Sequence, residues 1–152
     1  MAFKYSLEAA PKKQMPDPWI GFDLDGTIAS YDKFKGWQYI GDPVPGFINL
    51  IKKLRALGVT CKILTARASA ESRAIDGLTF EQVEKVIQDW TQIHIGERLP
   101  VVTEKGAAMI CLFDDSVIQV DKNTGMLTAG AKGFLPFADK IIQAIKAKKE
   151  LQ

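Results

Sequence analysis

The stretch Trp19-Ile20-Gly21-Phe22-Asp23-Leu24-Asp25-Gly26-Thr27 decides the fold of this chain. Its first four residues form a short apolar run, which is typical of a buried strand, and the run leads directly into acidic residues. In an extended segment Asp23 and Asp25 point to one side, while Leu24 points into the core. Gly26 then permits a turn and a close approach of the backbone to a ligand. The pattern predicts two carboxylates presented together at the end of a buried strand.

Strand-like apolar runs alternate with helix-like stretches along the rest of the chain. Thr79 and Gln82 form a capping box, the signature of a helix start, and Pro45 occupies a position that a first helical turn tolerates. This alternation predicts a mostly parallel sheet covered on both faces, a three-layer α/β/α Rossmann-like fold with right-handed crossovers. The predicted elements are strands over 19–22, 59–64, 101–102 and 109–113, helices from Pro45 to before Gly58, over 79–94 and from Pro136, and an edge β-hairpin joining 117–120 to 126–127.

Length and composition favour one ordinary globular domain. The chain has 152 residues, of which 47% are hydrophobic and 25% charged, so we expect a single domain over 18–149 after an N-terminal extension over 1–17. The extension lacks the apolar block of a secretory signal, and no run approaches the roughly 18 apolar residues of a membrane span, which predicts a cytoplasmic protein without membrane contact. Cys61 and Cys111 lie in strand-like stretches and are expected to be small hydrophobic residues.

Polar side chains follow three of the predicted strands. They are Asp23 and Asp25, then Thr65-Ala66-Arg67, then Asp114-Asp115. Sheets of this type bind ligands at the carboxyl ends of their strands, so these groups are expected to converge. Several carboxylates at one edge repel unless a cation compensates, and hard oxygen ligands suit Mg²⁺. A carboxylate can attack phosphorus while a neighbouring acid protonates the leaving oxygen and then activates water.

Four segments, in order, resemble the motifs of the haloacid dehalogenase superfamily. The likeness covers nearly the whole chain from Trp19 onward. The stretch from Phe113 to Gly125 is also similar to a small bacterial and phage subgroup of that superfamily, although Ser116 stands where the subgroup has an arginine. The segments are Asp23-Leu24-Asp25-Gly26-Thr27 for the first motif, Ile63-Leu64-Thr65-Ala66-Arg67 for the second, Thr103-Glu104-Lys105-Gly106 for the lysine motif, and Cys111-Leu112-Phe113-Asp114-Asp115-Ser116 for the acidic fourth motif.

The resemblance implies a phosphomonoesterase that uses Mg²⁺ and passes through an aspartyl-phosphate. Asp23 would be the nucleophile and Asp25 the acid/base. Thr65 would hydrogen-bond the transferring phosphoryl oxygens, and Lys105 would neutralise their charge and orient Asp23. The implied metal ligands are Asp23, the carbonyl of Asp25, and Asp114, with Asp115 supporting them or acting through water. The candidate substrate-binding residues are Gly26, Thr27, Ala66, Arg67 and Trp37; for Arg67 a salt bridge, and for Trp37 aromatic packing, stays an open alternative.

The sequence leaves little room for a cap domain over the site. Only 28–44 separates Thr27 from the first long helix, and only 68–78 separates Arg67 from the next. An open site suits a nucleotide, a nucleic-acid end or another bulky phosphate ester, unless a partner subunit covers it. Two alternatives stay open: a catalytically idle fold that binds a metal or a partner, and a receiver-like phospho-acceptor domain, whose acidic pair would follow the first strand instead of the last.

Overall fold

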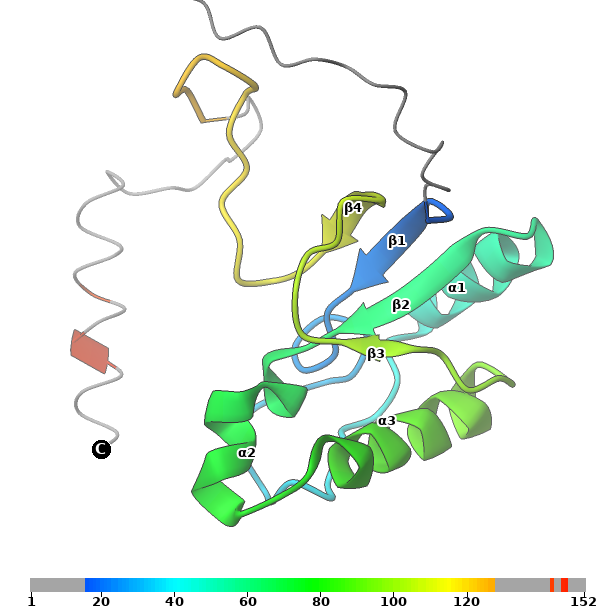
Figure 1. Cartoon of the computed structure of the whole chain (residues 1–152), viewed down its shortest axis with the longest axis vertical. Helices are drawn as coiled ribbons and strands as arrows, with labels where there is room; N and C mark the ends of the chain where they lie inside the picture. Colours follow the sequence, from blue (N-terminus) through cyan, green and yellow to red (C-terminus); the bar gives the residue numbers. More distant parts are fainter. Residues whose placement is uncertain (1–15, 128–142, 144–145, 148–152) are drawn as a thin grey trace, which may run out of the picture. The chain divides into compact units, whose positions relative to one another are not determined.

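The computed structural model describes residues 16–127, 143 and 146–147. The chain divides into two compact units, 1–115 and 116–152, and each is considered by itself. In the described ranges, no helix has both the length and the apolar character needed to cross a bilayer. The first unit contains β1 (Trp19–Phe22), α1 (Pro45–Ala56), β2 (Thr60–Leu64), the 3-10 turn η1 (Ala66–Ala68), α2 (Ala70–Asp76), α3 (Phe80–His94), β3 (Val101–Val102) and β4 (Met109–Phe113) (Figure 1).

The four strands form one parallel sheet in the order β3-β2-β1-β4. Phe22 at the end of β1 pairs with Ile63 of β2 on one side and with Phe113 of β4 on the other. Because every pairing is parallel, the carboxyl ends of the strands lie at one edge of the sheet. The predicted parallel α/β sheet is therefore confirmed, and the strands match the predicted ranges within one residue.

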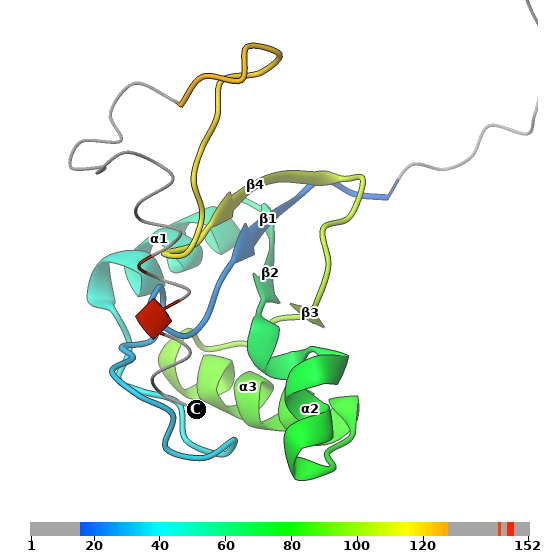
Figure 2. The same cartoon turned by 90° about the vertical axis from the view of Figure 1, so that its left-hand side faces the viewer.

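The helices α1 and α3 cover the same face of this sheet (Figure 2). Phe22 and Ile63 point to that face and share one buried cluster with Ile51 of α1 and Ile87 of α3. The chain steps from β1 to β2 to β3 in one direction, and right-handed crossovers then place both connecting helices on one side. Cys61 of β2 is buried in this core as expected.

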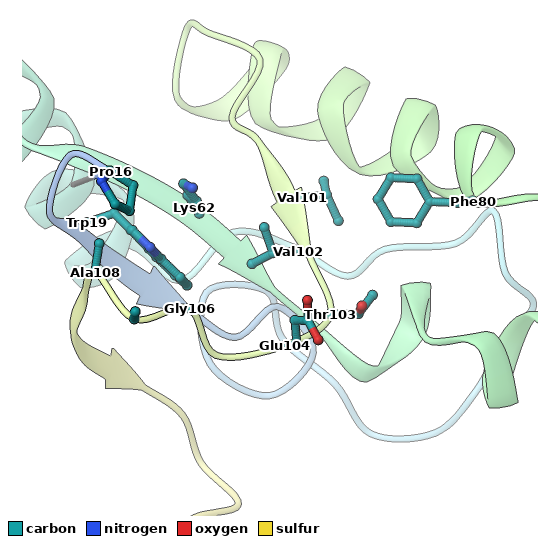
Figure 3. Close-up of a pocket in the computed structure, with 11 residues that line it drawn as sticks. Pro16, Trp19, Lys62, Phe80, Val101, Val102, Thr103, Glu104, Gly106 and Ala108 are labelled. Carbon is teal, nitrogen blue, oxygen red and sulfur yellow. The ribbon is translucent and has the colours of Figure 1, made fainter. Parts of the chain in front are cut away.

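Within the described first unit, no helix covers the opposite face of the sheet. Most of the helix predicted from Pro136 lies outside the described residues, although the described residues Gln143, Lys146 and Ala147 are helical, so the first unit by itself shows two layers where three were expected. On this face Trp19 is buried, with the Lys62 ammonium 4.8 Å from its ring centroid. Beside it opens a cavity of about 380 Å³ that is also lined by Phe80 and Glu104 (Figure 3). Cys111 of β4 is exposed, contrary to its expected burial.

The local signals for the helices are largely confirmed. The Thr79 hydroxyl accepts a hydrogen bond from the Gln82 N–H, and the Gln82 side chain accepts one from the Thr79 N–H, so α3 begins at the predicted capping box. Pro45 is in the first turn of α1. The short helix α2 was not predicted; Ser69 caps its start by accepting from the Ser72 N–H.

Residues 116–127 of the second unit form a turn with a single antiparallel bridge. Val120 and Leu127 make the bridge, and the Asp121 N–H donates to the Met126 carbonyl at 2.8 Å. Asn123 has a φ of 66°, a left-handed conformation that asparagine tolerates in turns. The predicted edge hairpin is thus reduced to one bridge, and the outermost strand of the described sheet on that side is β4.

Candidate active site

The end of β1 is held by a tight backbone loop. The Leu24 carbonyl accepts hydrogen bonds from the N–H groups of Thr27, Ile28 and Ala29, and the Leu24 side chain is fully buried. Gly26 has a φ of +92°, which favours glycine. A Cβ at this position would lie 2.7 Å from an Asp115 carboxylate oxygen. Only glycine allows the loop to pass this close to Asp115.

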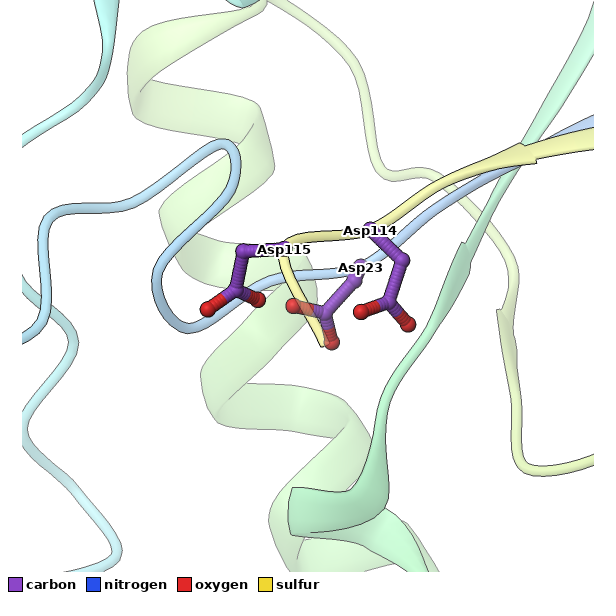
Figure 4. A group of neighbouring side chains, drawn as sticks. All are labelled: Asp23, Asp114 and Asp115. Atoms are coloured by element: carbon purple, nitrogen blue, oxygen red, sulfur yellow. The ribbon is translucent and has the colours of Figure 1, made fainter. Parts of the chain in front are cut away.

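Three aspartates converge at the carboxyl ends of β1 and β4. Asp23 follows β1, Asp114 and Asp115 follow β4, and one carboxylate oxygen from each lies within 4.8 Å of the others. Figure 4 shows the carboxylates of Asp23 and Asp114 side by side, with Asp115 next to them. The Asp23 N–H donates to the Phe113 carbonyl at 2.9 Å, which continues the pairing of the two strands up to the site. The convergence predicted from strand order is observed for these three residues.

Thr27 links two of the three aspartates. Its buried hydroxyl lies 3.1 Å from Asp23 Oδ2 and 3.3 Å from Asp115 Oδ1, so its single proton can be donated to either carboxylate. The same oxygen accepts a hydrogen bond from the Asp115 N–H at 3.1 Å. Thr27 is predicted to contact substrate; in the structure its hydroxyl links the carboxylates of Asp23 and Asp115.

The carboxylates of the cluster repel one another. Burial, and then the neighbouring Asp114 charge, raise the pKa of Asp23 from 3.8 to about 7, although hydrogen bonds from the Thr27 hydroxyl and the Leu24 backbone act in the opposite direction. A group of oxygen ligands with this excess of negative charge suits a hard divalent cation. The chemistry of the donors therefore suits a hard divalent cation, the class to which the expected Mg²⁺ belongs.

Asp25 points away from this cluster into an ion pair. Arg67 Nε donates to Asp25 Oδ2 at 2.8 Å and Nη2 donates to Oδ1 at 2.6 Å, a bidentate arrangement with both side chains largely buried. Arg67 Nη1 donates to the Trp37 carbonyl at 3.0 Å and approaches the Gly36 carbonyl at 3.5 Å. Of the two roles left open for Arg67, the structure shows the salt bridge.

Thr65 and Ala66 lie where β2 ends and η1 begins. Thr65 is almost fully buried, and its hydroxyl oxygen accepts the Arg67 N–H at 3.1 Å as the N-cap of η1. Thr65 therefore orders the turn that carries Arg67.

Lys105 makes no contact with Asp23 within the described residues, whereas Trp37 takes one of the two roles left open for it. Lys105 is exposed in the connection between β3 and β4, and among the described residues its ammonium forms no ion pair or hydrogen bond. The expected contact between Lys105 and Asp23 is not seen. Trp37 is half-buried and its side chain packs against the core, which is the packing alternative left open for it.

The segment 30–42, here called the flap segment, leaves the site beside the Asp25 loop. At its base the Ser30 N–H donates to the Asp42 carbonyl at 2.8 Å. A Cβ on Gly41 would lie 1.9 Å from the Ser30 carbonyl oxygen, so only glycine permits this closure. The Trp90 indole N–H donates to the Gly41 carbonyl. Gly41 was not among the predicted site residues, because its only local signal is that of a single glycine before an acidic residue.

No family model, curated protein or solved structure matches this chain.

Proposed function

We propose that the chain is a Mg²⁺-dependent phosphohydrolase in which Asp23 attacks phosphorus. The observation that carries the proposal is the convergence of Asp23, Asp114 and Asp115 at the edge of a parallel sheet where such folds bind ligands. Asp23 ends the inner strand β1, with β2 and β4 on either side. A group bound between these strand ends would meet the Asp23 carboxylate first.

Three carboxylates would hold the cation, namely Asp23, Asp114 and Asp115, with the Asp25 carbonyl as a further candidate ligand. When bound, Mg²⁺ would neutralise this cluster and the negative charge of a phosphate ester. A bound cation would lower the pKa of Asp23 from its raised value and would favour the ionised carboxylate, the form of Asp23 that can attack phosphorus.

The reaction has two displacements at phosphorus. An Asp23 carboxylate oxygen forms a bond to phosphorus, the ester P–O bond breaks, and the leaving oxygen takes a proton from the Asp25 carboxylic acid. A water molecule then attacks the aspartyl-phosphate, Asp25 takes its proton, and the Asp23–phosphorus bond breaks to release inorganic phosphate. Asp25 can serve in this way only after one of its oxygens leaves Arg67, because both oxygens accept from the guanidinium here.

A second candidate is a cation-binding module without turnover. The pairing of Asp25 with Arg67 and the exposure of Lys105 favour it, because neither group touches the aspartate cluster. Such a module would bind Mg²⁺ through the same three carboxylates. The two candidates differ in phosphate release and agree in metal binding, so both quantities are measured together.

The test is phosphate release from aryl phosphate, nucleotides, sugar phosphates and phosphorylated DNA ends, with Mg²⁺ or with EDTA. Asp23→Asn is the blank, and Asp89→Asn is the matched control, because Asp89 is paired with Lys85 and Arg98 on the surface of α3. We expect Mg²⁺-dependent release that Asp23→Asn abolishes and Asp89→Asn retains. The open site favours the nucleotide and DNA-end substrates in this panel.

Isothermal titration with Mg²⁺ separates the outcomes. Binding that is lost in Asp23→Asn, without phosphate release from any substrate, would support the cation-binding module. Release that persists in EDTA or in Asp23→Asn would refute the proposed mechanism. Lys105→Met in the same assay shows whether the lysine that resembles a motif residue contributes to turnover.

A further inference from the structure

The tip of the flap segment, residues 31–40, is joined to the rest of the first unit by the packing of Trp37 and Ile40 against the core and by few polar contacts. Tyr31, Phe34 and Tyr39 expose about half of their surface, and the Lys35 ammonium contacts Asp32 and Tyr39 within the tip itself. Within the described part of the chain, the hydrogen bonds from Arg67 to the Gly36 and Trp37 carbonyls are the only polar contacts that tie this tip to another element.

Arg67 thus joins two features that are distant in sequence. Its Nε and Nη2 face the Asp25 carboxylate, while its Nη1 faces the backbone of the flap tip. The side chain is 7% exposed, and its planar fork has donors in both directions at once. Its own backbone is fixed by the Thr65 cap at the start of η1, so the guanidinium is presented from a rigid turn.

We infer that Arg67 is a positioning residue that couples the flap tip to the orientation of the Asp25 carboxylate. While the tip is docked, the guanidinium holds both Asp25 oxygens away from the three-aspartate cluster. When the tip moves, the Trp37 carbonyl leaves Nη1, the fork loses its second support, and the Asp25 side chain is released to turn toward a bound ester. The contact of Arg67 Nη1 with the Trp37 carbonyl then controls both the access of a substrate and the orientation of the Asp25 carboxylate.

The inference rests on the proposed function for the role of Asp25, while the physical link itself is independent of any activity. The link is tested by amide hydrogen exchange of the full chain. The reporter is the Tyr39 N–H, which donates to the Gly36 carbonyl within the tip at 3.1 Å, and the reference is the Ser30 N–H at the base. Losing a charge-assisted contact should raise exchange at the tip by at least about tenfold.

The structure offers a matched control elsewhere in the same unit. Arg55 pairs with Glu97 through Nε and Nη2 and donates through Nη1 to the Val59 carbonyl, which is the same pattern as Arg67 without a flap. We expect Arg67→Ala to raise exchange at Tyr39 and leave Ser30 protected, and Arg55→Ala to leave both unchanged. Unchanged exchange at Tyr39 in Arg67→Ala, or an equal rise in both variants, would overturn the coupling.

Arg67→Lys serves if the alanine variant does not fold. A single ammonium keeps the charge but cannot span both Asp25 and the Trp37 carbonyl, so exchange at the tip should still rise. A lysine variant with native protection at Tyr39 would show that charge alone suffices and would refute the role of the fork.

Kinetics test the catalytic half of the inference. Because the Arg67 fork holds Asp25 away from a bound ester, Arg67→Lys should release Asp25 and raise kcat by a larger factor for alkyl than for aryl phosphates, since aryl leaving groups need less protonation. In the Asp25→Asn background the same change should alter kcat little. An equal effect on both substrates, or a loss of kcat on both, would refute the link between Arg67 and Asp25. If the native chain releases no phosphate at all, the proposed function fails, and the exchange experiment still decides the physical link.

Discussion

Replacing Asp23 by asparagine should stabilise the metal-free protein at neutral and alkaline pH. The pKa of Asp23 is raised from 3.8 to about 7 by burial and by Asp114. A raised pKa means that folding favours the neutral acid, so the native state keeps its full stability below about pH 4 and loses stability as the pH rises toward 7. Above pH 7 the loss is constant. Asparagine, which carries no charge, removes this loss.

The size of the stabilisation follows from the size of the pKa change of Asp23. At about 1.4 kcal/mol for each pKa unit, the change corresponds to an upper bound of about 4 kcal/mol, and solvent screening of a partly exposed carboxylate reduces it to about 2 kcal/mol. Urea unfolding in EDTA should therefore show a midpoint higher by about 1 M for Asp23→Asn at pH 8, and no difference near pH 4. Magnesium at ten times its Kd should return about 1.4 kcal/mol to the native chain and little to the variant.

The control for this experiment is Asp89→Asn. Hydrogen bonds from Lys85 and Arg98 lower the pKa of Asp89, so its charge stabilises the native state at high pH, the opposite sign. Its removal should leave the chain equally stable or slightly less stable at pH 8. Asp23→Asn could instead raise the free energy of unfolding equally at all pH values, or not at all. Either result would show that the charge of Asp23 in the aspartate cluster does not destabilise the metal-free protein.

Further substitutions test single contacts of the site and fold. Gly26→Ala forces a side chain into a positive φ and against Asp115, and should lower stability by about 1–3 kcal/mol in urea unfolding and weaken Mg²⁺ binding in calorimetry; native affinity would contradict the close approach. Thr27→Val keeps the shape but removes the hydroxyl, and should cost about 1–3 kcal/mol through the unsatisfied Asp115 N–H; thermal unfolding at the native midpoint would speak against this bridge. Thr79→Ala removes the capping box of α3 and should cost about 1 kcal/mol while Mg²⁺ affinity is unchanged; an altered affinity would tie the cap to the site.

Local sequence patterns predicted most of the elements and part of the site. The apolar run before Asp23, the capping box at Thr79 and the proline at the start of α1 each act through neighbouring residues, and each is found where the pattern placed it. The meeting of Asp23 with Asp114 followed from a topological rule, because parallel strands end at one edge.

Contacts between distant segments could not be predicted from local sequence patterns. Asp25 is close to Asp23 in sequence, yet its direction is set by Arg67, which comes 42 positions later. Both carboxylates were expected together at the end of the strand, and a competing guanidinium cannot be inferred from local periodicity. The position of Lys105 depends on the connection between β3 and β4, which contains no helix or strand to fix it. The short helix α2 has no buried residue, so it lacked the apolar periodicity that revealed α1 and α3.

The placement of β4 beside β1 also dictates when the site can come into existence during synthesis. The pairing joins Phe22 to Phe113, whereas the pairing of β1 with β2 needs only the chain up to Leu64. A growing chain can therefore assemble one half of the sheet early, while Asp23 still lacks its two acidic neighbours. The mutual repulsion of the aspartates begins only after the ribosome has delivered Asp114 and Asp115, and a divalent cation present at that moment would favour the last pairing step.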